Sequence, residues 1–103
     1  MKRRPPLTEQ EKKDALDALA TAVAGLKSAG EVRAFLEDLC TPAELEAMAD
    51  RWRVVPHLLA GVPYREIHDR TLVSVTTIGR VARTLEHGAG GYAVAVKRAS
   101  RTK

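Results

Sequence analysis

The sequence predicts a small all-helical domain, and two features carry that prediction. Apolar residues recur every three or four positions in several successive segments, which is the spacing of one face of an α-helix. Most of these segments follow a serine or threonine of the kind that caps helices, and no segment has a convincing strand pattern. With 103 residues and only 4% aromatics, the chain can build one modest core, which favours a homodimer that buries more surface.

The first two helices are marked by a capping signal and by apolar periodicity. Thr8 and Glu11 have the spacing in which a hydroxyl and a carboxylate cap the same helix start. The apolar stripe behind them predicts a helix over about residues 9–27. A second, shorter stripe predicts a helix over about residues 31–39.

A long third helix begins at the clearest start signal of the chain. Thr41 supplies an N-cap hydroxyl, Pro42 stands where a missing N–H costs nothing, and Glu44 completes the capping box. The apolar pattern then predicts a helix that ends near Gly61. Pro56 lies inside this pattern, where it removes one hydrogen bond and marks a candidate kink.

Two shorter helical segments follow a break at residues 61–63. The first is predicted over about residues 64–70, and residues 71–73 make a tight connection. Ser74 then caps a segment predicted to be helical over about residues 75–87.

Charge divides the chain more sharply than its net value of +4 indicates. Residues 5–50 carry ten acidic and four basic groups, whereas residues 51–103 carry ten basic and three acidic groups. The sequence predicts a basic arm over residues 1–8, one helical domain over 9–92, and a flexible basic tail over 93–103 behind a glycine-rich hinge. A basic second half favours a polyanionic partner over a merely solvated surface.

Residues 63–87 have the pattern of a helix-turn-helix. Ile67 on the first helix and Ile78 and Val81 on the second are spaced so that two steeply crossed helices bury them against each other. Polar, basic or small side chains are left on the other faces, where they can approach a DNA groove, its phosphates or a guanine edge. These candidate DNA-facing residues are Tyr64, Arg65 and His68 on the first helix, and Ser74, Thr76, Thr77, Gly79, Arg80 and Arg83 on the second.

The alternative for this segment is an ordinary helical hairpin whose arginines are merely solvated. The turn contains no glycine, and His68 stands where many such motifs hold a small residue. In the DNA-binding interpretation, Arg83 lies two turns into the second helix and is expected to touch phosphate rather than a base.

Several other functions are disfavoured by the residues themselves. His57, His68 and His87 are never three or four positions apart, so they do not form a helical metal site. Cys40 is the single cysteine, so no intramolecular disulfide can form, and we expect it to be a small buried side chain. No apolar run approaches the roughly 20 residues that span a bilayer. We therefore expect a cytoplasmic protein that is not an enzyme, with no metal and no membrane contact.

Five motifs stand in a fixed order over about residues 30–92. They are Cys40-Thr41-Pro42-Ala43-Glu44-Leu45, Arg51-Trp52-Arg53-Val54-Val55, Leu58-Leu59-Ala60-Gly61, Arg65-Glu66-Ile67 and Thr76-Thr77-Ile78-Gly79-Arg80. Together they resemble the trp repressor superfamily, and Gly90-Gly91-Tyr92 resembles its YerC/YecD-type branch. The resemblance implies an intertwined all-helical homodimer that binds operator DNA. It further implies a base-reading role for Arg65 and groove-facing positions for Val75, Thr76 and Gly79.

The same resemblance raises the question of a small-molecule effector. It implies that Arg51 and Arg80 would flank the indole of a bound tryptophan, with Thr41 and Thr84 as nearby polar contacts. Surface ion pairs and phosphate contacts are the alternative roles of the two arginines. Val81, however, stands where the trp repressor has a glycine, and its branched side chain is expected to fill pocket space. The sequence therefore predicts no cofactor, with tryptophan or a related effector as the open alternative.

The sequence as a whole predicts a sequence-specific transcriptional regulator, a repressor that binds a near-palindromic operator as a homodimer. Its partners would be double-stranded DNA and a second copy of the chain. Two alternatives stay open. One is a helical protein-interaction module whose basic tail binds an acidic partner, and the other is a nucleoid-type protein that binds DNA without sequence preference.

Overall fold

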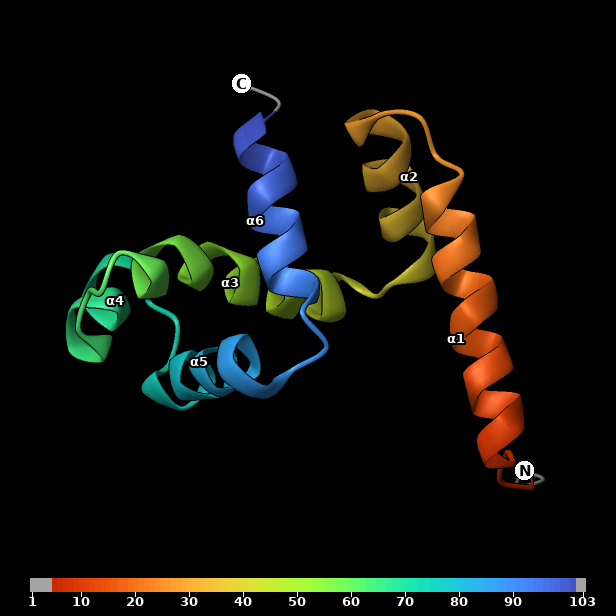
Figure 1. Ribbon diagram of the computed structural model, residues 1–103, viewed down its shortest axis with the longest axis horizontal. Helices are drawn as coiled ribbons and strands as arrows, with labels where there is room; N and C mark the ends of the chain where they lie inside the picture. The colour runs from red at the N-terminus through yellow and green to blue at the C-terminus, as the bar shows by residue number, and fades with distance from the viewer. Residues whose placement is uncertain (1–4, 102–103) are drawn as a thin grey trace. The chain divides into compact units, whose positions relative to one another are not determined.

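The computed structural model describes residues 5–101, and in this part of the chain it has helices and no strand (Figure 1). The all-helical prediction is therefore confirmed. The chain divides into two compact units, one ending at Thr41 and the other beginning at Pro42, whereas the sequence predicted one domain over residues 9–92. In chain order the helices are α1 (Glu9–Ala24), α2 (Ala29–Leu39), α3 (Pro42–Leu59), α4 (Tyr64–Thr71), α5 (Val75–His87) and α6 (Gly91–Arg101).

The first unit begins with the predicted capping box. The Thr8 hydroxyl accepts a hydrogen bond from the backbone N–H of Glu11 at 3.0 Å, and the Glu11 carboxylate accepts one from the Thr8 N–H at 2.8 Å. Ser28 caps α2 in the same way by accepting from the Glu31 N–H at 3.1 Å. Hydroxyls thus satisfy backbone donors that a helix start would otherwise leave unpaired.

The apolar faces of α1 and α2 are not covered within the first unit. No residue of either helix is buried, and the side chains of Leu16 and Leu39 are 65% and 51% exposed. An amphipathic helix in water gains most of its stability by packing its apolar face against another surface. The first unit therefore presents an apolar surface that would be stabilised by a partner.

The core of the second unit is enclosed by α3, α4 and α5, which pack against one another. Ile67 and Ile78 are fully buried, as their spacing predicted, and Val81 is buried with them. Leu85 lies half-buried at the margin of this core. The remaining members of the buried cluster are Val54, Val55 and Val73.

Residues 91–101 form α6, which corrects the prediction of a flexible tail from residue 93. Tyr92 and Val96, one turn apart, pack against the core of the second unit. The ring of Tyr92 also stacks on Trp52 of α3, with 6.5 Å between the ring centroids and 21° between the planes. These contacts stabilise α6, although the glycines before it and its basic residues had led to the prediction of a flexible tail. Residues 1–4 of the predicted basic arm and the last two residues of the chain lie outside the described residues.

Candidate nucleic-acid interface

The turn between α4 and α5 is closed by a buried threonine. The Thr71 hydroxyl donates to the carbonyl oxygen of Ile67 at 2.7 Å and accepts from the Val73 N–H at 3.1 Å. Leu72 has the left-handed conformation, with φ at 65°, and its N–H donates to the carbonyl oxygen of His68 at 2.7 Å. Leu72 thus adopts the left-handed conformation that glycine adopts most easily, and the hydrogen bonds of Thr71 hold the turn without a glycine.

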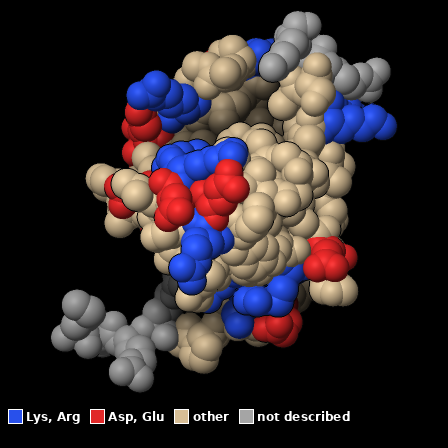
Figure 2. Space-filling model, turned by 90° about the vertical axis from the view of Figure 1, so that its left-hand side faces the viewer, with Lys and Arg blue, Asp and Glu red and all other residues tan. Residues whose placement is uncertain are grey.

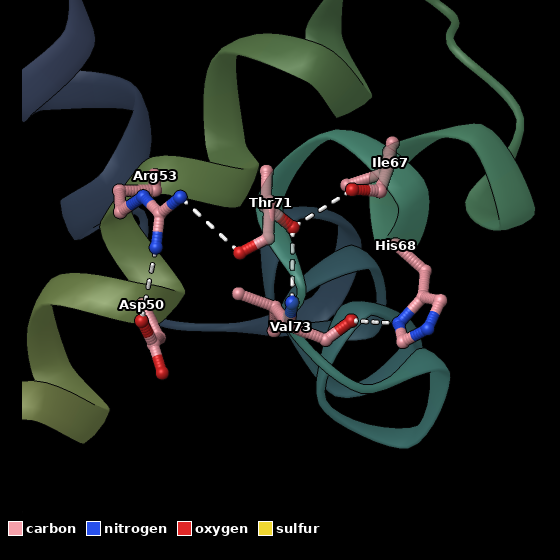
Figure 3. Close-up of polar contacts among 6 residues, drawn as sticks. All are labelled: Asp50, Arg53, Ile67, His68, Thr71 and Val73. Atoms are coloured by element: carbon pink, nitrogen blue, oxygen red, sulfur yellow. Dashed lines mark hydrogen bonds and ion pairs between the residues drawn. The ribbon is translucent and has the colours of Figure 1, made fainter.

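Two side chains tie this turn to the neighbouring elements (Figure 3). Arg53 of α3 donates to the carbonyl oxygen of Thr71 at 3.2 Å and pairs with Asp50 at 3.3 Å. His68 Nδ1 lies 2.7 Å from the carbonyl oxygen of Val73, and this nitrogen carries the proton because a carbonyl only accepts. The sequence placed His68 on the DNA side. In the structure His68 is half-buried and holds the turn through Nδ1.

Leu72→Gly is expected to raise the free energy of unfolding by about 1 kcal/mol, since glycine adopts the left-handed conformation without strain. Leu72 is 82% exposed, so the substitution removes little buried apolar surface. Urea denaturation at fixed protein concentration measures the change. Leu72→Ala is the matched control, because it removes the same side chain and keeps the strain. A glycine variant no more stable than the alanine variant would contradict this account.

The start of α5 is capped by its own hydroxyls. Ser74 accepts from the Thr77 N–H at 3.1 Å, and its hydroxyl donates to the Thr77 hydroxyl at 3.0 Å. Both predicted DNA-facing side chains are therefore also structural, since they hold the first turn of the helix. Val75 and Thr76, between them, are exposed.

The arginines of α4 and α5 divide by whether an acidic side chain pairs with them. Arg70 of α4 forms an ion pair with Glu66 on the same helix. Within residues 5–101, Arg65, Arg80 and Arg83 are exposed and make no ion pair or hydrogen bond through their side chains. On the side of the molecule where α4 lies, basic and acidic side chains stand next to each other, so this surface is not uniformly basic (Figure 2). Unpaired guanidinium groups on both helices leave their donors available to a polyanion.

Tyr64 and Gly79 bring α4 and α5 close together at this surface. Tyr64 is the first residue of α4 and is 42% exposed. Gly79 lies one turn into α5 with the Tyr64 ring beside it. The structure thus collects the predicted DNA-facing residues on two adjoining helices, α4 and α5, and on the turn that joins them.

The candidate effector residues have other partners or positions. The Thr84 hydroxyl donates to the carbonyl oxygen of Arg80 at 3.0 Å. Arg51 is half-buried on α3, and the neighbouring Asp50 pairs with Arg53 instead of with it. Three of the four candidates, Arg51, Arg80 and Thr84, lie in the second unit. The fourth, Thr41, is the last residue of the first unit. Val81 is only 1% exposed, so its side chain is part of the core.

Residues 5–101 offer neither a metal site nor a membrane span. No group of three or more His, Cys, Asp or Glu side chains in that range could hold a metal ion. No helix in the same range is long and apolar enough to cross a membrane. The single cysteine, Cys40, is half-buried and forms no disulfide.

A helix-turn-helix that buries its apolar side chains and exposes unpaired arginines on both helices is the architecture of a DNA-binding protein. The family described as Trp repressor protein matches residues 14–100, which is most of the chain. The chain belongs to this family, whose members are DNA-binding regulators and not enzymes.

Two similar proteins support the assignment. The uncharacterized protein YerC of Bacillus subtilis is 36% identical over 88 residues, which is 85% of each chain. The crystal structure of a Trp repressor candidate from Staphylococcus aureus matches with a TM-score of 0.78 and 31% identity. That match covers 91% of this chain and 96% of the other. The similarity to the YerC-type branch that Gly90-Gly91-Tyr92 indicated is therefore confirmed.

Proposed function

We propose that the chain is a transcriptional repressor that binds a near-palindromic operator as a homodimer, in the cytoplasm, with α5 in the major groove. The observation that carries this proposal is the set of exposed, unpaired arginines on a helix-turn-helix whose turn is fixed by buried hydrogen bonds. A fixed turn holds both helices in one geometry, which sequence-specific reading requires. Arg65 would read a base and Arg83 would contact phosphate.

Selection of bound sites from a random DNA pool tests the proposal directly. We expect a near-palindromic consensus whose half-sites lie about 34 Å apart, one turn of DNA. Affinity for the selected site and for a scrambled site is then compared at two salt concentrations. Equal affinity for both would favour nucleoid-type binding, and no binding would favour a protein-interaction module with an acidic partner.

The homodimer is supported by the uncovered apolar faces of α1 and α2. Sedimentation equilibrium at micromolar protein is expected to give about twice the 11.2 kDa of one chain. Leu16→Glu on the apolar face of α1 should raise the monomer fraction. Thr21→Glu adds the same charge to the opposite face of the helix and should not. A well-folded wild-type monomer would rule out the dimer.

We propose further that operator binding needs no tryptophan. The Val81 side chain is buried, and the Thr84 hydroxyl is already bonded to a backbone carbonyl oxygen. Operator affinity is therefore expected to be the same with and without millimolar tryptophan. An increase in affinity on adding tryptophan would show that the ligand is an effector after all.

The basic residues of α6 are expected to add affinity without adding specificity. Because α6 packs on the core, deleting it would also damage the fold, so charge is better removed by substitution. Lys97→Gln with Arg98→Gln should weaken operator and scrambled DNA by the same factor. For every phosphate that is no longer neutralised, the logarithmic salt slope should flatten by about 0.9. Lys12→Gln with Lys13→Gln removes the same charge from α1 and serves as control. A changed operator-to-scrambled ratio in the α6 variant would contradict the prediction.

A further inference from the structure

Gly79 lies beside two long side chains that come from both helices of the helix-turn-helix. The position that a Cβ would occupy at Gly79 is 3.6 Å from Nη1 of Arg83 and 3.8 Å from Cε2 of Tyr64. Helical side chains lean toward the N-terminus of their helix, so Arg83 reaches back over Gly79, one turn earlier. Tyr64 reaches the same place from the start of α4. One atom of the guanidinium and one atom of the phenol ring therefore lie within 4 Å of the same point beside Gly79.

Within the part of the chain that the structure describes, the polar atoms of both side chains have no hydrogen-bond or ion-pair partner. Glu86 stands three residues after Arg83 on α5, at a spacing that suits an ion pair, yet no ion pair forms. The Tyr64 hydroxyl likewise has no hydrogen-bond partner within residues 5–101. Both side chains are exposed, so a guanidinium fork and a hydroxyl donor face solvent together.

We propose that Tyr64 and Arg83 grip one backbone phosphate of the bound DNA together, and that Gly79 leaves the space in which they meet. The proposal rests on the proposed function and deepens it. A phosphodiester has two non-bridging oxygens that share one negative charge, and both can accept hydrogen bonds from the parallel donors of a guanidinium and from the single donor of a phenol. The first helix of a helix-turn-helix crosses the DNA backbone, and Arg83 lies beyond the residues of α5 that enter the groove. Phosphate, rather than a base edge, is therefore the anion within reach of both.

A double-mutant cycle tests whether the two side chains act on the same group. Tyr64→Phe removes only the hydroxyl, and Arg83→Gln removes the charge and the guanidinium donors while keeping a polar side chain. Each variant is expected to weaken operator and scrambled DNA alike, by about tenfold for the arginine. The double variant should be weakened little more than Arg83→Gln alone, because two side chains on one phosphate are coupled. Strictly additive losses would overturn the shared grip. Arg70→Ala, which removes a paired arginine from α4, is the control.

Operators with a single neutral methylphosphonate locate the contact. Scanning the position along the half-site should reveal one phosphate at which neutralisation weakens the wild type but no longer weakens Tyr64→Phe or Arg83→Gln. Two different phosphates for the two variants would overturn the proposal. If the wild type binds no operator, both the proposed function and the shared phosphate contact are wrong. If the wild type binds and both variants match it, only the grip is wrong.

Gly79→Leu tests the space itself. Leucine favours the helix over glycine, so the thermal midpoint should not fall, yet its side chain would displace Tyr64 and Arg83. Operator affinity is expected to drop to the level of Arg83→Gln. In the Arg83→Gln background the same leucine should cost clearly less affinity than in the wild type, whereas a direct clash between the leucine and DNA would cost the same affinity in both backgrounds. A full loss in both backgrounds, or no loss in either, would show that Gly79 does not serve this pair.

Discussion

Ile78→Ala is expected to lower the free energy of unfolding by about 2–5 kcal/mol, the usual cost of truncating a fully buried isoleucine. Ile78 has no exposed surface, and Ile67 of α4 belongs to the same buried cluster. The cavity would therefore open between the two helices of the helix-turn-helix. Since a small domain is stable by only about 5–15 kcal/mol, we also expect weaker operator binding through partial unfolding.

Two variants of α5 make this expectation specific. Ile78→Val removes one methylene and should cost about 0.5–1.5 kcal/mol. Val75→Ala truncates a half-exposed side chain on the same helix and should cost less than about 1 kcal/mol. Urea denaturation at fixed protein concentration ranks the three. A loss below about 1 kcal/mol for Ile78→Ala would mean that the neighbouring side chains close the cavity.

Local sequence signals predicted the helices because the decisive interactions are local. The Thr8 capping box and the Ser74 cap join residues three positions apart, so their spacing in the sequence is enough to predict them. Ile67 and Ile78 were identified as partners because periodicity shows which face of each helix is apolar. What periodicity could not show is that α1 and α2 leave their apolar faces uncovered within the first unit.

The features that sequence reasoning missed depend on contacts between distant residues. Arg53 bonds to the carbonyl of Thr71, 18 positions away, and no local pattern marks that pairing. In α6, Tyr92 and Val96 did carry a four-residue apolar spacing, but glycines and basic residues around them pointed to a tail. Burial against α3 outweighs that weak local preference, as tertiary packing often does.

The candidate site was predictable in part for the same reason. Arg65, Arg80 and Arg83 lie off the apolar faces of their helices, and the structure leaves all three exposed. The sequence position of His68 predicted that it faces DNA. In the structure its side chain instead stabilises the turn by a hydrogen bond to the carbonyl oxygen of Val73. The proximity of Tyr64 to Gly79 depends on the angle between α4 and α5, which the sequence does not specify.

Arg65→Ala is expected to cost about 1–3 kcal/mol of operator binding per half-site and to relax the preference at one base pair in each. Arg65 is exposed on α4 and has no acidic partner within residues 5–101, although Asp69 stands one turn away. Its planar fork can donate to both acceptors on a guanine edge, which a lysine cannot imitate. Arg65→Lys should therefore lose nearly as much discrimination as Arg65→Ala.

Arg70→Ala is the matched control for this prediction, because it removes the same charge from the same helix. Arg70 is already paired with Glu66, so its removal should change the operator-to-scrambled affinity ratio little. Arg83→Ala is expected to weaken all sequences by a similar factor and to lower the salt slope, as the removal of a phosphate-binding cation does. Binding isotherms on operator and scrambled DNA at two salt concentrations separate these outcomes. An unchanged ratio in Arg65→Ala would show that α4 positions the protein on the backbone and that base reading belongs to α5 alone.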